Sequence, residues 1–299
     1  MMRRKQGGEL PFHLMLIPGV VLVFIYSYIP MAGIVMAFKR LVPSKGMFGS
    51  PWVGWHNFEY MMHMPEISGV IWNTAFIAVM KMTAGVLVPV TFALMLNEAR
   101  SRLFKRSVQT IIYFPHFLSW IILSGLLIDI LSPSTGIVNE LLRALGLKEI
   151  YFLGDPRWFP YTMVLSDTWK EFGYGTIVYL AALTGINPAL YEAAALDGAG
   201  RLRQTLYVTL PGLLPMIVLM SVLSLGNVLN AGFEQIFNLY SPQVYRTGDI
   251  IDTLVFRIGL ENANYGVATA VGLFKSVVSF GLIGASYVLA YRWTNYRIF

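Results

Sequence analysis

Six stretches of this chain are long and poor in charged residues. The hydrocarbon core of a bilayer needs about 20 apolar residues for each helix that crosses it, and every stretch exceeds that length. A backbone in lipid must also satisfy its own hydrogen bonds, so only helices and closed barrels can span. The predicted spans are residues 12–38, 70–96, 107–131, 161–183, 212–239 and 266–291.

The composition agrees with a membrane class. The chain is 56% hydrophobic and 13% charged, whereas soluble domains carry roughly 25% charged residues. There is no cysteine, which excludes disulfides and thiolate metal sites. The net charge of +6 raises nucleic acid as a partner, but most Lys and Arg flank the apolar stretches, as in membrane proteins. We therefore predict an all-α polytopic membrane protein with six transmembrane helices in one domain, residues 1–299, and no nucleic-acid partner.

Basic residues also predict the orientation. If both termini are inside, the inner segments hold 11 Lys and Arg, the outer loops hold 8, and Lys81, Lys170 and Lys275 lie within spans. The inner segments are shorter, so their basic density is higher, which places both termini in the cytoplasm. The outer loops are long and either connect helices or form a docking surface; they cover residues 39–69, 132–160 and 240–265.

The inner segment between the fourth and fifth predicted spans contains a short helix, at about residues 188–198. Asn187 is a good N-cap, Pro188 suits the first helical position, and Gly198 suits a C-terminal stop. Such a helix either docks on a cytoplasmic partner or rests on lipid headgroups. Its carboxylates, Glu192 and Asp197, would face an anionic leaflet unfavourably, which favours docking.

The same residues carry a family resemblance. Glu192-Ala193-Ala194, three residues, Gly198, nine residues and then Val208-Thr209-Leu210-Pro211 resembles the EAA signature of bacterial ABC importer permeases, with valine in place of isoleucine. The resemblance implies the type I importer permease fold, in which a cytoplasmic coupling helix between helices 4 and 5 docks on an ATP-binding subunit. The implied coupling residues are Tyr191, Glu192, Ala193, Ala194, Asp197 and Gly198.

Residues 109–120, 166–175 and 230–235 extend the resemblance to the LplB-like permeases for oligo- and polysaccharides. It implies a membrane-spanning subunit of an ATP-driven carbohydrate importer in a bacterial cytoplasmic membrane. The implied partners are a second permease, two ATP-binding cassette subunits and an extracytoplasmic solute-binding protein. The chain contains no Gly-x-x-x-x-Gly-Lys-[Ser/Thr] phosphate loop, so we expect no enzyme activity and no cofactor of its own, with ATP and Mg²⁺ held by the ATPase. No metal site is expected either, because the histidines show no metal-binding spacing: His13, His56, His63 and His116.

Span five carries the main candidates for a substrate pathway. On one continuous helix, Asn227, Asn230 and Glu234 would share a face, and amides with a carboxylate suit sugar hydroxyls. Such residues also make interhelical hydrogen bonds, so both interpretations stay open. The pathway candidates are Asn227, Asn230, Phe233 and Glu234 on span five with Trp169 and Tyr174 on span four, and Phe237 and Tyr240 add apolar surface.

Three charged residues on span four, Asp167, Lys170 and Glu171, are expected to form ion pairs rather than to contact substrate. Intramembrane charges also leave open an ion-coupled secondary transporter, although no internal repeat supports it. A permease of the same family for glycerol phosphate or an amino acid is a second alternative, and phosphate would need Lys81 or Lys275. A receptor or scaffold without transport is the third.

Overall fold

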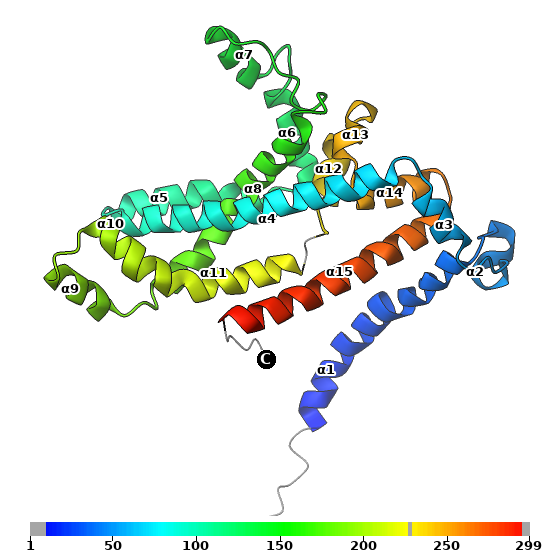
Figure 1. Ribbon diagram of the computed structural model, residues 1–299, viewed down its shortest axis with the longest axis horizontal. Helices are drawn as coiled ribbons and strands as arrows, with labels where there is room; N and C mark the ends of the chain where they lie inside the picture. Colours follow the sequence, from blue (N-terminus) through cyan, green and yellow to red (C-terminus); the bar gives the residue numbers. More distant parts are fainter. Residues whose placement is uncertain (1–9, 227–228, 295–299) are drawn as a thin grey trace, which may run out of the picture. The chain divides into compact units, whose positions relative to one another are not determined.

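The computed structural model describes residues 10–226 and 229–294 and is helical almost throughout these ranges. Within them the backbone forms no strand, and the one extended pairing is an isolated bridge between Lys39 and Trp52. The chain divides into two compact units. Unit 1 contains Met1–Met64 and Val255–Phe274, and unit 2 contains Pro65–Leu254 and Lys275–Phe299. Figure 1 shows the elements in sequence colours.

Unit 1 begins with one long helical run that changes type along its length. The α-helix α1 (Leu10–Val23) passes into a π turn, η2 (Phe24–Tyr28), and then into a 3₁₀ segment, η3 (Ile29–Phe38). Pro30 lies in the first turn of the 3₁₀ segment, where a missing backbone N–H costs little. The run includes Phe12–Phe38, an apolar stretch of 27 residues that is long enough to cross a bilayer.

A small polar and aromatic core closes unit 1 after this run. Buried Asn57 donates hydrogen bonds to the carbonyls of Ala37 (2.9 Å) and Lys39 (3.0 Å). The ring of Phe38 packs on Trp52, Trp55 and Phe58. The remaining elements are η4 (Pro43–Lys45), α2 (Gly46–Gly49), α3 (His56–Met62), η8 (Arg257–Glu261) and the first part of α15 (Tyr265–Thr294).

Unit 2 is built around the packed pair α4 (Ile67–Glu98) and α8 (Phe159–Leu183). Helices α5, α6, α11 and α12 pack on this pair or on each other. The other bounds are α5 (Arg102–Tyr113), η5 (Phe114–Phe117), α6 (Trp120–Ile130), α7 (Ile137–Ala144), α9 (Pro188–Leu196), α10 (Arg201–Gln204), η6 (Thr205–Thr209), α11 (Leu210–Leu225), α12 (Phe233–Leu239), η7 (Pro242–Val244), α13 (Tyr245–Gly248) and α14 (Ile251–Phe256).

Two apolar clusters form the core of unit 2, and a polar layer separates them along α4 and α8. One cluster joins Ile77 of α4 to Met163 of α8 and Ile236 of α12. The other joins Val90 of α4 to Tyr179 of α8 and to α11. Between these levels lie Lys81 and Asp167, which are paired to each other.

Length and composition identify four described helical runs that could cross a membrane, and a fifth if one bent pair counts as a single span. They are Phe12–Phe38, Ile67–Glu98, Arg201–Leu225 and Tyr265–Ser286, with Arg102–Phe117 plus Trp120–Ile130 as the bent pair. Helix α8, which carries Asp167, Lys170 and Glu171, is not among them. The count is compatible with six predicted spans, since α8 is the sixth.

Two predicted spans are not the single straight helices that we expected. The third span bends by 106° between η5 and α6, because Leu118 is extended and Ser119 caps a new helix. The fifth span ends at Leu225 and resumes at Phe233 after Gly232, whose φ is +93°. A continuous helix cannot pass through that left-handed conformation.

Candidate functional site

Helix α9 is a separately capped helix, as its sequence predicts. Asn187 accepts a hydrogen bond from the backbone N–H of Ala189 (3.0 Å), and Pro188 occupies the first helical position. At the other end Gly198 has φ +78°. Its N–H bonds the carbonyl of Ala195 (3.0 Å), and the next N–H bonds the carbonyl of Ala194 (2.9 Å). This pair of bonds is a Schellman stop, so both ends of the helix are fixed by local chemistry.

Contacts also attach α9 to the base of α11. The hydroxyl of Tyr191 shares a hydrogen bond with Thr209 Oγ1 (3.0 Å), which joins the two halves of the Glu-Ala-Ala signature. Ile186, just before α9, lies so close to Gly212 that a Cβ there would meet its Cδ1 at 2.8 Å. These two contacts connect α9 and the segment before it to η6 and α11.

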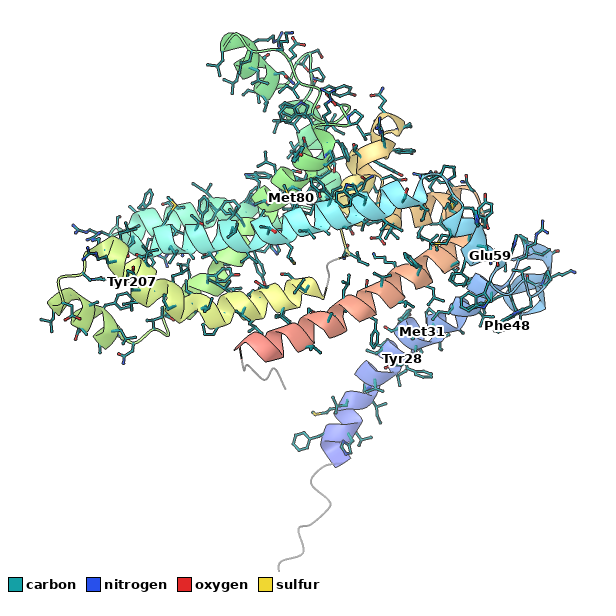
Figure 2. All side chains as sticks on the ribbon, viewed as in Figure 1. Tyr28, Met31, Phe48, Glu59, Met80 and Tyr207 are labelled. Carbon is teal, nitrogen blue, oxygen red and sulfur yellow. The ribbon has the colours of Figure 1, made fainter. Side chains whose placement is uncertain are left out.

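The predicted coupling residues form an open surface. Glu192, Ala193, Asp197 and Gly198 are exposed, and Tyr191 and Ala194 are half-buried. No residue of α9 is buried. Large apolar side chains are exposed on the same helix, at Leu190 and Leu196. Tyr207 on η6, labelled in Figure 2, is exposed as well. An exposed mixture of small, apolar and acidic residues on a rigid helix is suited to a protein partner.

The polar layer is organised by the ammonium group of Lys81. It donates to Asp167 Oδ1 (3.2 Å), to the carbonyl of Ala231 (2.8 Å) and to the side-chain oxygen of Gln235. These three acceptors match the three protons that a lysine can donate. The side chain is only 9% exposed. Lys81 thus joins α4 to α8, to α12 and to the break before α12.

Gln235 completes this layer. Its side chain is fully buried, and its amide donates to the carbonyl of Met163 and to Ser166 Oγ, both at 2.8 Å. The break in span five is therefore stabilised by side chains, because Lys81 bonds the Ala231 carbonyl where a helix would have supplied a backbone N–H. Lys81 Nζ also lies 2.7 Å from the position that a Cβ on Gly232 would take, so only glycine fits there.

The charges of span four form ion pairs, as expected, but not all within the helix. Lys170 pairs with Glu171 (2.8 Å), whereas Asp167 pairs with Lys81 of α4. Glu171 also accepts a hydrogen bond from His116 Nδ1 (2.7 Å).

Of the two pathway candidates on this helix, Tyr174 stacks on the His116 ring, with centroids 4.2 Å apart. Trp169 is half exposed but is five residues away from Tyr174, so the two side chains lie on different faces of α8.

The candidates on span five do not lie on one helical face, because the helix is interrupted. Asn230 lies within the break and accepts a bond from the Gly232 N–H (3.4 Å), while Glu234 follows the break on α12. Both are exposed. Asn227 lies outside the described residues. The expectation of a shared face is therefore wrong for Asn230 and Glu234.

An aromatic series does follow α12. Phe233 and Phe237 stack with centroids 5.3 Å apart, and Phe237, Tyr240 and Tyr245 continue the series at 6.1 Å and 5.0 Å. The four rings lead from the break at Gly232 to α13. All four rings are partly buried, and Tyr240 also packs against the apolar cluster around Ile236.

Comparison with known families decides between the transporter classes. The family described as "Binding-protein-dependent transport system inner membrane component" matches residues 85–295, more than half of the chain. The chain belongs to this family. It is therefore a permease, and the alternatives of a secondary transporter and of a scaffold without transport no longer apply.

Two curated relatives from Bacillus subtilis (strain 168) are similar to this permease over most of their length. One is the polygalacturonan/rhamnogalacturonan transport system permease protein YteP, 39% identical over 96% of this chain and 89% of the relative. The other is the protein LplB, 40% identical over 92% of this chain and 87% of the relative. The resemblance to LplB-like permeases is thus confirmed.

A solved structure has the same fold. A chain in the crystal structure of a bacterial ABC transporter that imports the acidic polysaccharide alginate matches with a TM-score of 0.89 and 40% identity, covering 96% of both chains. The same kind of transporter in complex with an alginate pentasaccharide-bound periplasmic protein matches with a TM-score of 0.87. The type I importer permease fold, predicted from the Glu-Ala-Ala signature, is confirmed.

Sequence reasoning missed the network around Lys81. Gln235 lies in a segment that carries the family resemblance but was not predicted as a site residue. Asp167 was expected to form an ion pair, but Lys81 was not predicted as its partner. One signal was present in the sequence, because Lys81 and Asp167 are opposite charges within different predicted spans, and charges in the membrane tend to pair.

Proposed function

We propose that this permease forms half of the translocation pathway of an ATP-driven importer for an oligosaccharide. The other half is a second, similar permease, since one chain offers one coupling helix and two ATP-binding subunits need two. Both termini lie in the cytoplasm, which puts α9 on the side of the ATPases. The named substrates of the relatives, polygalacturonan, rhamnogalacturonan and alginate, support a carbohydrate as the solute.

The observation that carries the choice of solute is the aromatic series from Phe233 to Tyr245. Sugar rings present apolar C–H faces that pack on aromatic rings, and their hydroxyls need donors and acceptors nearby. The exposed side chains of Asn230 and Glu234 lie at the start of the series and supply both kinds of group. A saccharide can therefore be handed along the rings while its hydroxyls change polar partners.

A phosphate solute has less support from the same region. Phosphate binding would need a cationic side chain that is not already paired with a carboxylate. Each of the two candidate lysines is paired with an aspartate. Lys81 pairs with Asp167, and Lys275 pairs with Asp252 at 2.6 Å. The intramembrane cations are thus neutralised within the chain, which favours a solute recognised through hydroxyls and ring faces.

The coupling step follows from the attachments of α9. ATP binding closes the two ATPase subunits, and the cleft that holds α9 moves with them. Through Tyr191–Thr209 and the Ile186–Gly212 contact, α9 displaces the base of α11, and the pathway changes the side to which it opens. The solute arrives on an extracytoplasmic binding protein that docks on the outer loops. ATP and Mg²⁺ belong to the ATPases, and the permease needs no cofactor of its own.

The test uses the complete transporter in proteoliposomes, with the binding protein loaded with alginate pentasaccharide or oligogalacturonate. We expect Asn230→Ala, Glu234→Ala and Phe237→Ala each to lower uptake about tenfold, the scale of one or two lost polar or ring contacts. Subunit assembly should be unchanged. The matched control is Phe12→Ala, which removes an exposed ring from α1, outside the outer loops.

Normal uptake in all three variants would mean that these side chains only pack, and the pathway would have to be sought on α8. Uptake of glycerol phosphate in place of both saccharides would overturn the choice of solute.

A further inference from the structure

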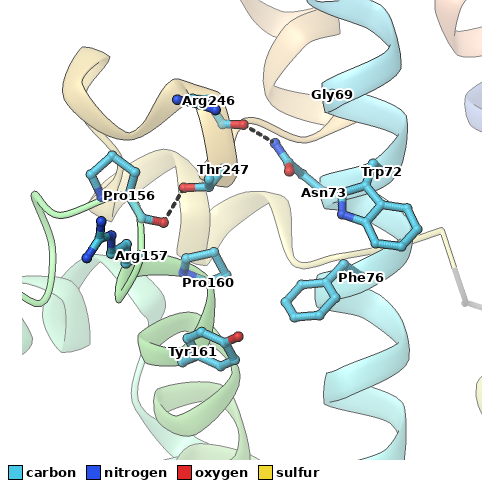
Figure 3. Close-up of a pocket in the computed structure, with 10 residues that line it drawn as sticks. All are labelled: Gly69, Trp72, Asn73, Phe76, Pro156, Arg157, Pro160, Tyr161, Arg246 and Thr247. Carbon is cyan, nitrogen blue, oxygen red and sulfur yellow. Dashed lines mark hydrogen bonds between the residues drawn. The ribbon is translucent and has the colours of Figure 1, made fainter.

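A hollow of about 450 Å³ lies between the beginnings of α4 and α8, beside α13. None of its lining residues belongs to the aromatic series or to α9. Figure 3 shows its lining: the rings of Trp72, Phe76 and Tyr161 come from the two long helices, and Arg157 and Arg246 come from the loop before α8 and from α13. An apolar floor with cations at the rim suits an amphipathic anion.

The frame of this pocket is fixed by hydrogen bonds. Asn73 Nδ2 donates to the backbone carbonyls of Arg246 (3.1 Å) and Asp249 (3.2 Å), which holds the α13 segment on α4. Thr247 Oγ1 donates to the Pro156 carbonyl (2.6 Å), which joins that segment to the loop that carries Arg157. The two arginines therefore start from backbone positions that are fixed to each other and to α4.

The charge at the rim is positive. Both arginines are exposed, and neither has an ion pair within the part of the chain that the structure describes. One carboxylate, Asp155, lies beside them and accepts a bond from the Arg157 backbone N–H (2.8 Å). Two guanidinium groups against one carboxylate leave a net cationic rim.

The pocket lies at the beginning of two predicted spans. Trp72 is the third residue of the predicted span 70–96, and Tyr161 is the first residue of the predicted span 161–183, which places both rings near the membrane–water interface. Tryptophan and tyrosine are enriched at that depth.

Apolar surface continues from the pocket towards the membrane centre. On α4, Trp72 and Val79 share a face and are 68% and 47% exposed. On α8, Leu165 is one turn below Tyr161 and is 72% exposed. A soluble acidic ligand would use the arginines alone, whereas an acyl chain would also cover this stripe.

We propose that this pocket binds an anionic phospholipid, with Arg157 and Arg246 on the headgroup phosphate and an acyl chain along Trp72, Val79 and Leu165. Guanidinium groups bind phosphate through paired hydrogen bonds. The site fixes the outer ends of α4 and α8, which flank the polar layer, and so makes the stability of that layer dependent on anionic lipid.

The test is a lipid titration of the complete transporter complex by native mass spectrometry, with phosphatidylglycerol and phosphatidylcholine. We expect Arg157→Gln/Arg246→Gln to weaken phosphatidylglycerol binding about fivefold for each arginine. Phosphatidylcholine binding should weaken much less, because its choline already neutralises the phosphate that the arginines contact. Trp72→Ala should weaken both lipids. The matched control is Arg143→Gln/Lys148→Gln, which removes two charges from another exposed segment beyond the same ends of the spans.

Three results would overturn the proposal. Equal phosphatidylglycerol binding by the arginine and control variants would exclude a role for these cations. Displacement of the lipid by inorganic phosphate at equal concentration would indicate a site for a free anion. Unchanged lipid binding with weaker docking of the solute-binding protein would assign the arginines to an acidic protein surface.

Discussion

The polar layer around Lys81 and the exposed helix α9 both contain charged side chains. The two regions differ in whether those charges find partners within the chain. Lys81 finds all of its hydrogen-bond acceptors inside the chain. Glu192 and Asp197 of α9 are exposed, and no ion pair joins either to another described residue. The first region is complete within the permease, while the second presents groups for a partner.

This difference separates stability from coupling. A buried cation with three partners fixes the geometry of the helices that supply them, so its removal should damage the fold. An exposed carboxylate on a separately capped helix contributes little to the stability of the fold. Its removal should therefore weaken only the binding of a partner at that surface. Single substitutions in the two regions can therefore be compared directly.

The largest effect is expected for Lys81→Met. The substitution leaves the half-buried Asp167 without its cation, and removing one partner of a buried ion pair typically costs about 3–5 kcal/mol. Thermal unfolding of the detergent-solubilised protein should begin at a clearly lower temperature, with less folded protein recovered from membranes. Fluorescence-detected size-exclusion chromatography after heating measures both.

The double variant Lys81→Met/Asp167→Leu tests the cause, because it removes both charges and should be more stable than Lys81→Met alone. Lys148→Met, at an exposed loop position, is the control and should unfold like the parent. If Lys81→Met also unfolds like the parent, the polar layer does not hold the fold.

Glu192→Lys should have a smaller effect on the fold and a large one on assembly. Reversing a carboxylate that a partner buries costs about 2–5 kcal/mol of binding energy, more than tenfold in affinity. We expect normal amounts in the membrane but loss of the ATP-binding subunits in a tagged pull-down. Glu140→Lys on α7, exposed to a similar degree, is the control. Retention of the ATPases with normal transport would show that Glu192 is not part of the coupling surface.

Helix α9 could be predicted from the sequence because its causes are local. The cap at Asn187, the proline that follows and the glycine at 198 lie within 12 residues, and each acts through nearby backbone groups. The apolar spans were predictable for a similar reason, since the bilayer imposes a length that can be counted.

The interruption of span five could not be predicted in the same way. The residues that stabilise it come from α4, α8 and α12, and Lys81 is 154 positions from Gln235. The sequence shows an apolar stretch with three glycines, which fits a continuous helix equally well. The tertiary contacts of Lys81 and Gln235 stabilise the broken form. The prediction of one polar face on a continuous helix fails for that reason.

The smallest effect, and the sharpest test of the comparison, is expected for Tyr191→Phe. Its hydroxyl is the one polar link recorded between the described residues of α9 and Thr209, and a hydrogen bond of this kind contributes about 0.5–1.5 kcal/mol. Assembly with the ATPases should survive, because Glu192 is unchanged. Transport per ATP hydrolysed should fall about two- to tenfold, because α9 then moves without carrying η6 and α11 with it. Tyr26→Phe removes the same hydroxyl from an exposed tyrosine on η2 and should leave that ratio unchanged. Measuring uptake and ATPase rate in the same proteoliposomes gives the ratio directly. Equal ratios for the two variants would mean that α9 is coupled to α11 through its backbone connections and the Ile186–Gly212 contact alone.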